Sequence, residues 1–103
     1  MAAAKRAVWS PAAEHDLHDI WAYYARVGSP SVADNLLRDI QRAGEAIAEH
    51  PLLSRDRREL LPDLRCVVVY PHVIFFRVRE DDVEIARVLH GRRYFPAIFS
   101  KEE

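Results

Sequence analysis

The stretch that decides the fold is residues 65–94, RCVVVYPHVIFFRVREDDVEIARVLHGRRY. Short apolar runs in it are separated by the turn candidates Pro71-His72 and Asp81-Asp82, which is typical of three antiparallel β-strands joined by tight turns. The stretch ends in Arg87-Val88-Leu89-His90-Gly91-Arg92-Arg93-Tyr94, where basic and aromatic side chains are concentrated. It therefore predicts a β-meander with a cationic end.

The residues before the meander predict a short strand at residues 5–9 and then two helices. Ser10-Pro11 and Ser29-Pro30 each combine a helix-capping hydroxyl with a proline at the first helical position. Gly28 and Pro51 mark the two helix ends. Apolar residues recur at helical spacing in both segments: Ala13, Leu17, Ile20, Trp21 and Tyr24, then Val32, Leu36, Ile40, Ala43 and Ile47. The short connection predicts an antiparallel hairpin.

Together these segments predict one domain spanning residues 1–103. Its parts are the helical hairpin at about 10–50, a polar connector at 52–64, the meander at 65–90 and a tail at 91–103. The expected fold class is α+β, with a short N-terminal strand and an antiparallel helical hairpin packed on a three- to four-stranded, mainly antiparallel sheet. Half of the residues are hydrophobic, so a core is possible without disulfides, and the single cysteine, Cys66, is predicted to be buried.

The two turns predict a register for the meander. Val69 would face Ile74, Val67 would face Phe76, Val78 would face Ile85 and Ile74 would face Leu89, all on the face that the helices cover. The same register puts Arg65 and Arg87 on that face. The opposite face would carry Val68, Phe75, Arg77, Val88, His90 and the charge pair of Arg79 with Glu84. Its apolar middle predicts either a partner surface or a cover formed by residues 95–99.

Charge and composition exclude several kinds of site. The formal net charge is −1, with acids concentrated in the helices and arginines in the sheet half, so attraction of the whole chain to nucleic acid is not expected. Glu14, His15, His18 and Asp19 could be drawn as a metal site, but without further ligands they are interpreted as a solvated helix face. No metal or cofactor is predicted. Without a signal peptide or a long apolar run, no membrane association and a cytoplasmic location are expected.

One cluster could carry chemistry, namely Arg65, Arg87, His90, Arg92, Arg93 and Tyr94. Arginines near a histidine and a tyrosine could cleave RNA without a metal, by proton transfer and by stabilising the crowded phosphate. The alternative is that these side chains are structural or solvated. Residues 6–100 contain no lysine, and this absence favours the structural interpretation.

The order of strand, helical hairpin and meander resembles the RelE/ParE superfamily of bacterial type II toxins over residues 5–94. His50-Pro51 at the close of the second helix and Arg87-Val88-Leu89-His90 in the last strand resemble its ParE branch. The other matching segments are Leu17-His18-Asp19-Ile20-Trp21, Tyr23-Tyr24, Ile47-Ala48-Glu49, Leu64-Arg65, His72-Val73-Ile74-Phe75-Phe76-Arg77-Val78 and Val83-Glu84-Ile85-Ala86. Tyr94 departs from the acid that often follows the arginine pair in ParE-like chains, and the tail after it is unusually apolar.

Membership of the ParE branch implies a toxin that inhibits DNA gyrase, has no catalytic residue and forms a hetero-oligomer with a cognate antitoxin. The partner-binding residues would be Arg65, Arg77, Arg87, His90, Arg92, Arg93 and Tyr94. The RelE branch is the alternative; it implies a ribosome-dependent, metal-independent mRNA endoribonuclease with Arg65, Arg87 and Tyr94 as catalytic residues. A third possibility is a member that only binds its antitoxin.

Overall fold

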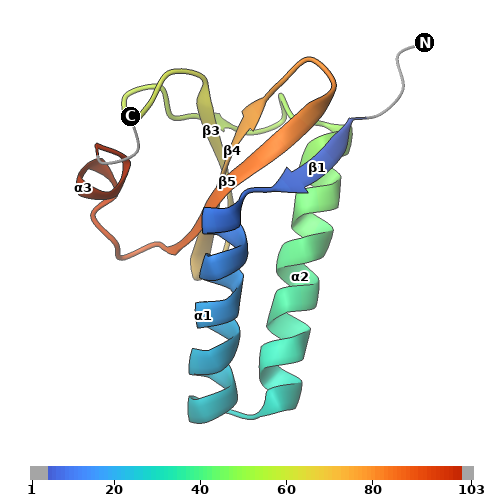
Figure 1. The fold of residues 1–103 in the computed structure, drawn as a ribbon, viewed down its shortest axis with the longest axis vertical. Helices are drawn as coiled ribbons and strands as arrows, with labels where there is room; N and C mark the ends of the chain where they lie inside the picture. The colour runs from blue at the N-terminus through green and yellow to red at the C-terminus, as the bar shows by residue number, and fades with distance from the viewer. Residues whose placement is uncertain (1–4, 101–103) are drawn as a thin grey trace.

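The computed structural model describes residues 5–100, which form one mixed sheet with helices on both faces (Figure 1). The predicted α+β class is confirmed. The elements in chain order are β1 (Arg6–Trp9), α1 (Pro11–Val27), α2 (Pro30–Glu49), β2 (Arg55–Asp56), β3 (Leu64–Val69), β4 (His72–Val78), β5 (Asp82–His90) and α3 (Phe95–Phe99).

The sheet has five strands in the order β1-β5-β4-β3-β2. β1 lies parallel to β5, and every other pair is antiparallel. The extra strand relative to the sequence prediction is β2, which lies inside the predicted polar connector and pairs Arg55 with Cys66 and Asp56 with Arg65. Part of that connector is therefore fixed to the edge of the sheet.

The helical hairpin forms where the capping signals predict it. Ser10 Oγ accepts the N–H of Ala13 at 3.0 Å, and Ser29 Oγ accepts the N–H of Val32 at 3.2 Å. The first helix ends at Gly28, whose N–H donates to the carbonyl of Tyr24. α1 and α2 then run side by side in opposite directions beside the sheet (Figure 1).

The predicted register is shifted by two residues at both turns. Val67 pairs with Ile74 and Val69 with His72, so the first loop is Tyr70-Pro71 and His72 belongs to the strand. In the second hairpin Val78 pairs with Val83. Asp82 pairs with Arg6 of β1, which draws it into the strand. A shift of two residues keeps every side chain on its predicted face.

A β-bulge at Ala86 changes the faces of the last part of β5. Phe76 pairs with Ile85 but Phe75 pairs with Arg87, so Ala86 has no partner in β4. The bulge lies where β1 leaves the edge of β5: the N–H of Ser10 donates to the Ile85 carbonyl, and its Oγ donates to the Ala86 carbonyl. As a result, Val88 and His90 lie on the helix-covered face and Leu89 on the other, which reverses their predicted placement.

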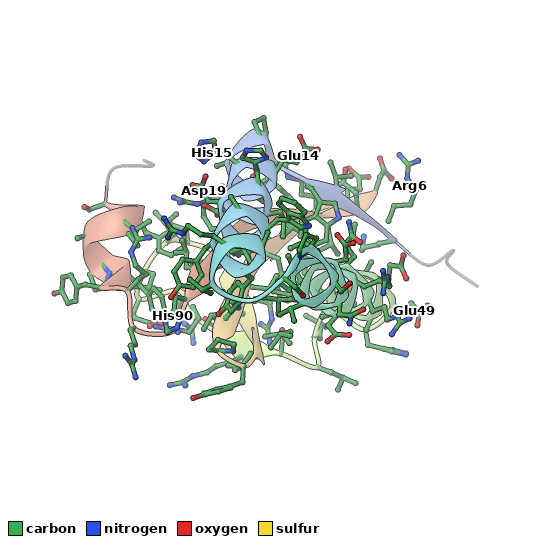
Figure 2. All side chains as sticks on the ribbon, turned by 90° about the horizontal axis from the view of Figure 1, so that it is seen from below. Arg6, Glu14, His15, Asp19, Glu49 and His90 are labelled. Carbon is green, nitrogen blue, oxygen red and sulfur yellow. The ribbon has the colours of Figure 1, made fainter. Side chains whose placement is uncertain are left out.

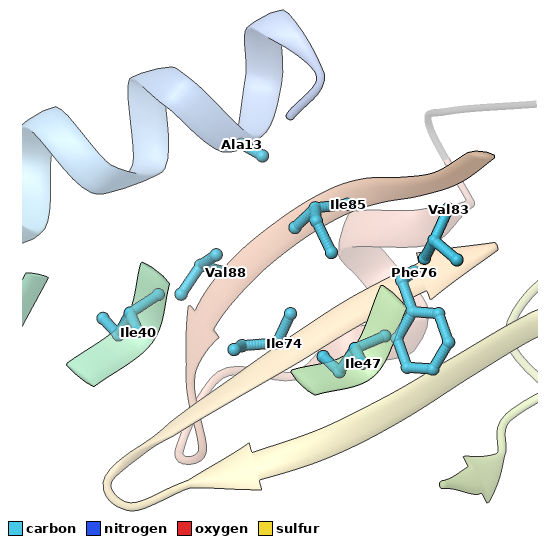
Figure 3. Packing of buried hydrophobic residues seen from close by; sticks show 8 residues of the cluster. All are labelled: Ala13, Ile40, Ile47, Ile74, Phe76, Val83, Ile85 and Val88. Atoms are coloured by element: carbon cyan, nitrogen blue, oxygen red, sulfur yellow. The ribbon is translucent and has the colours of Figure 1, made fainter. Parts of the chain in front are cut away.

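Two apolar clusters form the core, one on each face of the sheet. Figure 3 shows the first, in which Ile40 and Ile47 of α2 pack against Ile74, Phe76 and Ile85. The predicted burial of Phe76 is confirmed, since its side chain is 0% exposed. Leu17, Ile20 and Leu36 border this cluster, as the helical stripes predict.

The second cluster shows that the tail covers the opposite face. Phe99 of α3 is fully buried against Phe75, with ring centroids 4.8 Å apart, and Phe95 lies 4.9 Å from Phe75. The Arg57 guanidinium lies over the rings of Phe75 and Phe95, and Cys66 is buried in the same cluster. Of the two explanations for the apolar middle of this face, the cover by the tail is therefore confirmed.

Candidate functional site

The most strongly bonded side chain among the predicted site residues is Arg87. Its Nε and Nη2 donate to the two carboxylate oxygens of Asp16 in α1, at 2.8 and 2.9 Å. The backbone N–H of Val88 also donates to Asp16 Oδ2, at 2.9 Å. The Asp16 and Arg87 side chains are only 9% and 18% exposed, so this bidentate pair is largely desolvated. The pair joins α1 to Arg87 and Val88 of β5, which lie beyond the residues of β5 that pair with β1.

Arg65 lies in a different part of the molecule from Arg87. Its Nε donates to Ser54 Oγ at 2.7 Å, and its Nη2 donates to the Ser54 carbonyl at 2.9 Å. It lines a cavity of about 250 Å³ with Arg58 and Val78, which Arg87 does not reach. The predicted placement of Arg65 and Arg87 together on the helix-covered face is wrong, because Arg65 pairs with Phe76 whereas the bulge sets Arg87 opposite Phe75.

Three further site residues follow β5 in an exposed turn, namely Arg92, Arg93 and Tyr94. The Tyr94 side chain is 73% exposed and makes no hydrogen bond to any residue between 5 and 100. Arg77, the remaining predicted partner-binding arginine, lies opposite Glu84, and its buried Nε has no hydrogen-bond partner. These side chains are therefore spread over the sheet and do not converge on one point.

One cavity, which we call the histidine pocket, lies between α1, the first residue of β4 and the last residues of β5. It has a volume of about 320 Å³, and its lining includes Ile20, Tyr23, Tyr24, His72, His90 and Arg93 together with the acids Asp16 and Asp19. The Tyr24 ring lies 5.9 Å from that of His72, which lies 5.7 Å from that of His90, both edge to face. Burial, and secondarily the charge of His90, lower the pKa of His72, so this ring is neutral near pH 7.

The acidic and histidine residues of α1 that resemble a metal site lie on its surface. His15 Nδ1 is 3.3 Å from Asp19 Oδ2, and both side chains are more than half exposed. Figure 2 places Glu14 and His15 on the outer side of α1 and His90 on the side of the sheet. Within residues 5–100 no group of three or more His, Cys, Asp or Glu side chains is arranged to hold a metal ion.

The comparison with known families agrees with this architecture. The model of the ParE toxin of the type II toxin-antitoxin system, parDE, matches residues 7–95. The chain belongs to the ParE toxin family. The resemblance to the ParE branch, drawn from the His-Pro helix end and the last strand, is thereby confirmed.

Individual ParE proteins resemble the chain over most of its length. Toxin ParE1 of Mycobacterium tuberculosis strain H37Rv is 36% identical over 89 residues, which cover 84% of this chain and 90% of that protein. Toxin ParE1 of Caulobacter vibrioides is 38% identical over 78 residues, covering 76% and 80%. A structure titled as the chromosomal ParDE TA system from P. aeruginosa matches with a TM-score of 0.73 at 21% identity, covering 84% and 96%. At that identity, the structural match shows a shared fold.

Sequence reasoning missed two members of this region, Asp16 and His72. Asp16 is not singled out among the acids of the first helix, although it follows the buried Ala13 by three residues and so lies on the inner face of the helix. That spacing is the signal that could have identified it. His72 was assigned to a turn, and only the register of the hairpin places it in β4. None of the helices within residues 5–100 is long and apolar enough to span a membrane.

Proposed function

We propose that this ParE-family chain acts by binding DNA gyrase, without chemistry of its own, and that a cognate antitoxin neutralises it in a hetero-oligomeric complex. The observation that supports a binding role is the separation of the candidate catalytic residues. Arg87 is bound to Asp16, Arg65 is bound to Ser54, and Tyr94 is exposed and makes no hydrogen bond within residues 5–100. An acid–base site needs its members within hydrogen-bond reach of one substrate atom.

The antitoxin part of the proposal is supported by an open edge of the sheet. β2 covers β3 only at Arg65 and Cys66, so Val67, Val68 and Val69 have no strand beside them on that side within residues 5–100. The side chains of Val68 and Tyr70 are 64% and 90% exposed. Such an edge can accept an extended peptide by strand addition, with the backbone providing the hydrogen bonds.

Three of the predicted partner-binding arginines have no acidic partner. Arg77, Arg92 and Arg93 form no salt bridge within residues 5–100. Their guanidinium groups suit antitoxin carboxylates, because an arginine fork matches a carboxylate geometrically. We expect the antitoxin to bury well over ~1,000 Å² in total.

Two parallel assays test the proposed target. Purified chain is added to gyrase with supercoiled plasmid, and separately to programmed ribosomes with mRNA. The proposal expects gyrase–DNA cleavage complexes or loss of supercoiling, together with intact mRNA. Cuts in mRNA with unaffected gyrase would reject it in favour of a RelE-like endoribonuclease, and no effect in either assay would favour a chain that only binds its antitoxin.

Co-expression tests the antitoxin. The protein encoded by the adjoining reading frame should copurify with the chain and should slow amide hydrogen exchange at Val67, Val68 and Val69. A neighbour that does not copurify, while the chain stays soluble and monomeric, would contradict this part of the proposal.

A further inference from the structure

The histidine pocket has hydrogen-bonding groups that the protein leaves unused. His72 is 3% exposed, and its Nδ1 has no hydrogen-bond partner. Such groups are uncommon, because a buried polar atom without a partner destabilises the folded state. His90 Nδ1 accepts the N–H of Arg92 at 3.1 Å, so the neutral ring carries its proton on Nε2. That donor has no partner among residues 5–100. Because His72 Nδ1 is itself shielded from solvent, the unused group that a ligand can reach is the Nε2–H of His90.

The unused charge at the mouth of the pocket is positive. Arg93 lines the pocket and forms no salt bridge within the described chain. The lining also contains two acids: Asp16, which is paired with Arg87, and Asp19, which lies 3.3 Å from the exposed His15. A ligand that enters beside Arg93 and His90 therefore meets donors and a free cation, which favour a carboxylate.

The remaining wall is aromatic and aliphatic. The rings of Tyr23, Tyr24, His72 and His90 form a continuous edge-to-face row, with neighbouring centroids 5.1, 5.9 and 5.7 Å apart. Ile20, Val88 and Leu89 complete the apolar lining. Rows of this kind favour a further aromatic ring, which can add to the edge-to-face pattern. The volume of about 320 Å³ is at the small end of ligand sites, so it suits a side chain better than a cofactor.

The register of the sheet links the pocket to the strand that has the open edge. Val69 pairs with His72, and His72 pairs with His90, so these residues form one row across β3, β4 and β5. Neighbouring strands are about 4.8 Å apart, so a peptide strand added outside β3 would lie about 14 Å from β5, the reach of roughly four extended residues. A polypeptide bound along Val67, Val68 and Val69 can therefore reach the pocket within a few residues.

We infer that the histidine pocket binds an aromatic side chain of the antitoxin that has a carboxylate next to it, such as a phenylalanine or tryptophan beside an aspartate or glutamate. The ring would stack against Tyr24 and His72, while the carboxylate would meet Arg93 and the free N–H of His90. The choice of the antitoxin as the source of this group rests on the proposed function. The preference of the pocket for an aromatic carboxylate is independent of the proposed function.

A fragment titration tests the chemistry of the pocket on the free, full-length chain. The probe is 3-phenylpropionate, its uncharged control is 3-phenylpropanamide, and the readout is the side-chain NMR signals of His72 and His90. We expect the acid to shift both signals with a Kd of about 1–10 mM, typical of a fragment of this size. The amide should bind about five-fold or more weakly, because it lacks the charge that Arg93 attracts.

Matched variants locate the binding. Arg93→Gln should reduce the affinity for the acid to that for the amide and leave the amide unchanged. Arg58→Gln, which removes an exposed arginine at the other cavity, should change neither. The inference is overturned if the two probes bind equally, if the shifts lie outside the pocket, or if no binding is seen at about 50 mM, well above the expected Kd.

The antitoxin is tested on the complex with the protein encoded by the adjoining reading frame. Because an antitoxin side chain would fill the pocket in this complex, 3-phenylpropionate should no longer shift the NMR signals of His72 and His90. A complex that binds the probe as well as the free chain does would overturn this inference and leave the proposed function standing. Failure to form any complex would overturn the antitoxin as partner, both in this inference and in the proposed function.

Discussion

The pair of Asp16 and Arg87 is the residue-scale feature on which the site depends. Arg87 is predicted to contact a partner or RNA, but its Nε and Nη2 both donate to Asp16 inside the protein. A buried charge that loses its partner is destabilising, so Arg87 cannot leave Asp16 without a substantial cost in free energy. Its role is to fix α1 against β5, which also sets one wall of the histidine pocket.

The first prediction concerns this pair. Replacing Asp16 by Asn leaves the Arg87 guanidinium buried without a counter-charge, so the free energy of unfolding should fall by about 3–5 kcal/mol. Urea denaturation measures the change. Glu84→Gln is the control, because it breaks the more exposed pair with Arg79 and should cost less than about 1 kcal/mol. Equal losses of unfolding free energy in the two variants would show that the Asp16–Arg87 pair stabilises the fold no more than an exposed ion pair does.

The second prediction follows from His72. Burial lowers its folded-state pKa, with a further contribution from His90. The unfolded chain therefore binds more protons in acid, so the stability due to neutral His72 is complete above its unfolded pKa of about 6.5 and is lost as the pH falls below it. The other charged or titratable groups around it are Tyr23 and Tyr24 on α1, His90 on β5, and Asp16, Asp19 and Arg93 in the pocket lining.

Denaturation at about pH 7.5 and about pH 5.5, on either side of that unfolded pKa, measures this effect. His72→Gln should lose less stability on acidification than the unchanged chain does. His15→Gln, which alters an exposed histidine, should keep the original dependence. If the His72 variant keeps it too, another group is responsible for the loss of stability in acid.

At the scale of elements, the sequence predicts those helix and strand boundaries that are set by neighbouring residues. The helices begin at Ser10 and Ser29 because each hydroxyl caps its own first turn, and this information lies within three residues. The bulge at Ala86 has no such local signal, since it occurs where β1, from the other end of the chain, leaves the edge of β5. The spacing from Ala13 places Asp16 on the inner face of its helix, but no local signal identifies its partner, because Arg87 is 71 residues away.

The third prediction concerns the contact between β1 and α2. A Cβ atom on Gly44 would lie 2.6 Å from Cζ2 of Trp9, so the indole ring packs directly on the helix backbone. Helix propensity alone predicts that Gly44→Ala stabilises by about 1 kcal/mol. We expect the overlap to dominate, with a net loss of about 1–2 kcal/mol in unfolding free energy.

A double-mutant cycle isolates that overlap. In a Trp9→Leu background the ring is absent, so Gly44→Ala should be neutral or stabilising. Glu45→Ala, at an exposed position of the same helix, should change stability by less than about 0.5 kcal/mol in either background. A loss from Gly44→Ala that persists without Trp9 would contradict the packing argument.

The fourth prediction concerns α3. Because Phe99 is fully buried against Phe75, Phe99→Ala should lower the free energy of unfolding by about 3–5 kcal/mol. Tyr94→Ala, five residues earlier and mostly exposed, should cost less than about 1 kcal/mol. Thermal or urea unfolding of both variants measures the difference. A tail that only contacts partners would give two equally small effects.

At the scale of the whole molecule, this burial changes how a loss of toxicity after tail deletion must be interpreted. Deleting residues 94–103 removes the surface turn and also Phe99, a member of the core. Loss of toxicity in such a truncation would therefore combine lost contact area with partial unfolding. Single substitutions in the exposed turn separate the two effects, because they leave both apolar clusters intact.

The last prediction uses that separation to distinguish binding from catalysis. If the chain acts through a protein surface, Tyr94→Phe removes one exposed hydroxyl and should change gyrase inhibition by less than about three-fold, a difference of under 1 kcal/mol. If Tyr94 transferred a proton during RNA cleavage, the same change should lower the rate by roughly 10²–10⁴-fold. Circular dichroism confirms that the variant is folded, and Phe99→Ala provides the unfolding reference. A folded Tyr94→Phe variant whose activity falls a hundred-fold or more would overturn the binding mechanism, because no loss of contact area accompanies the substitution.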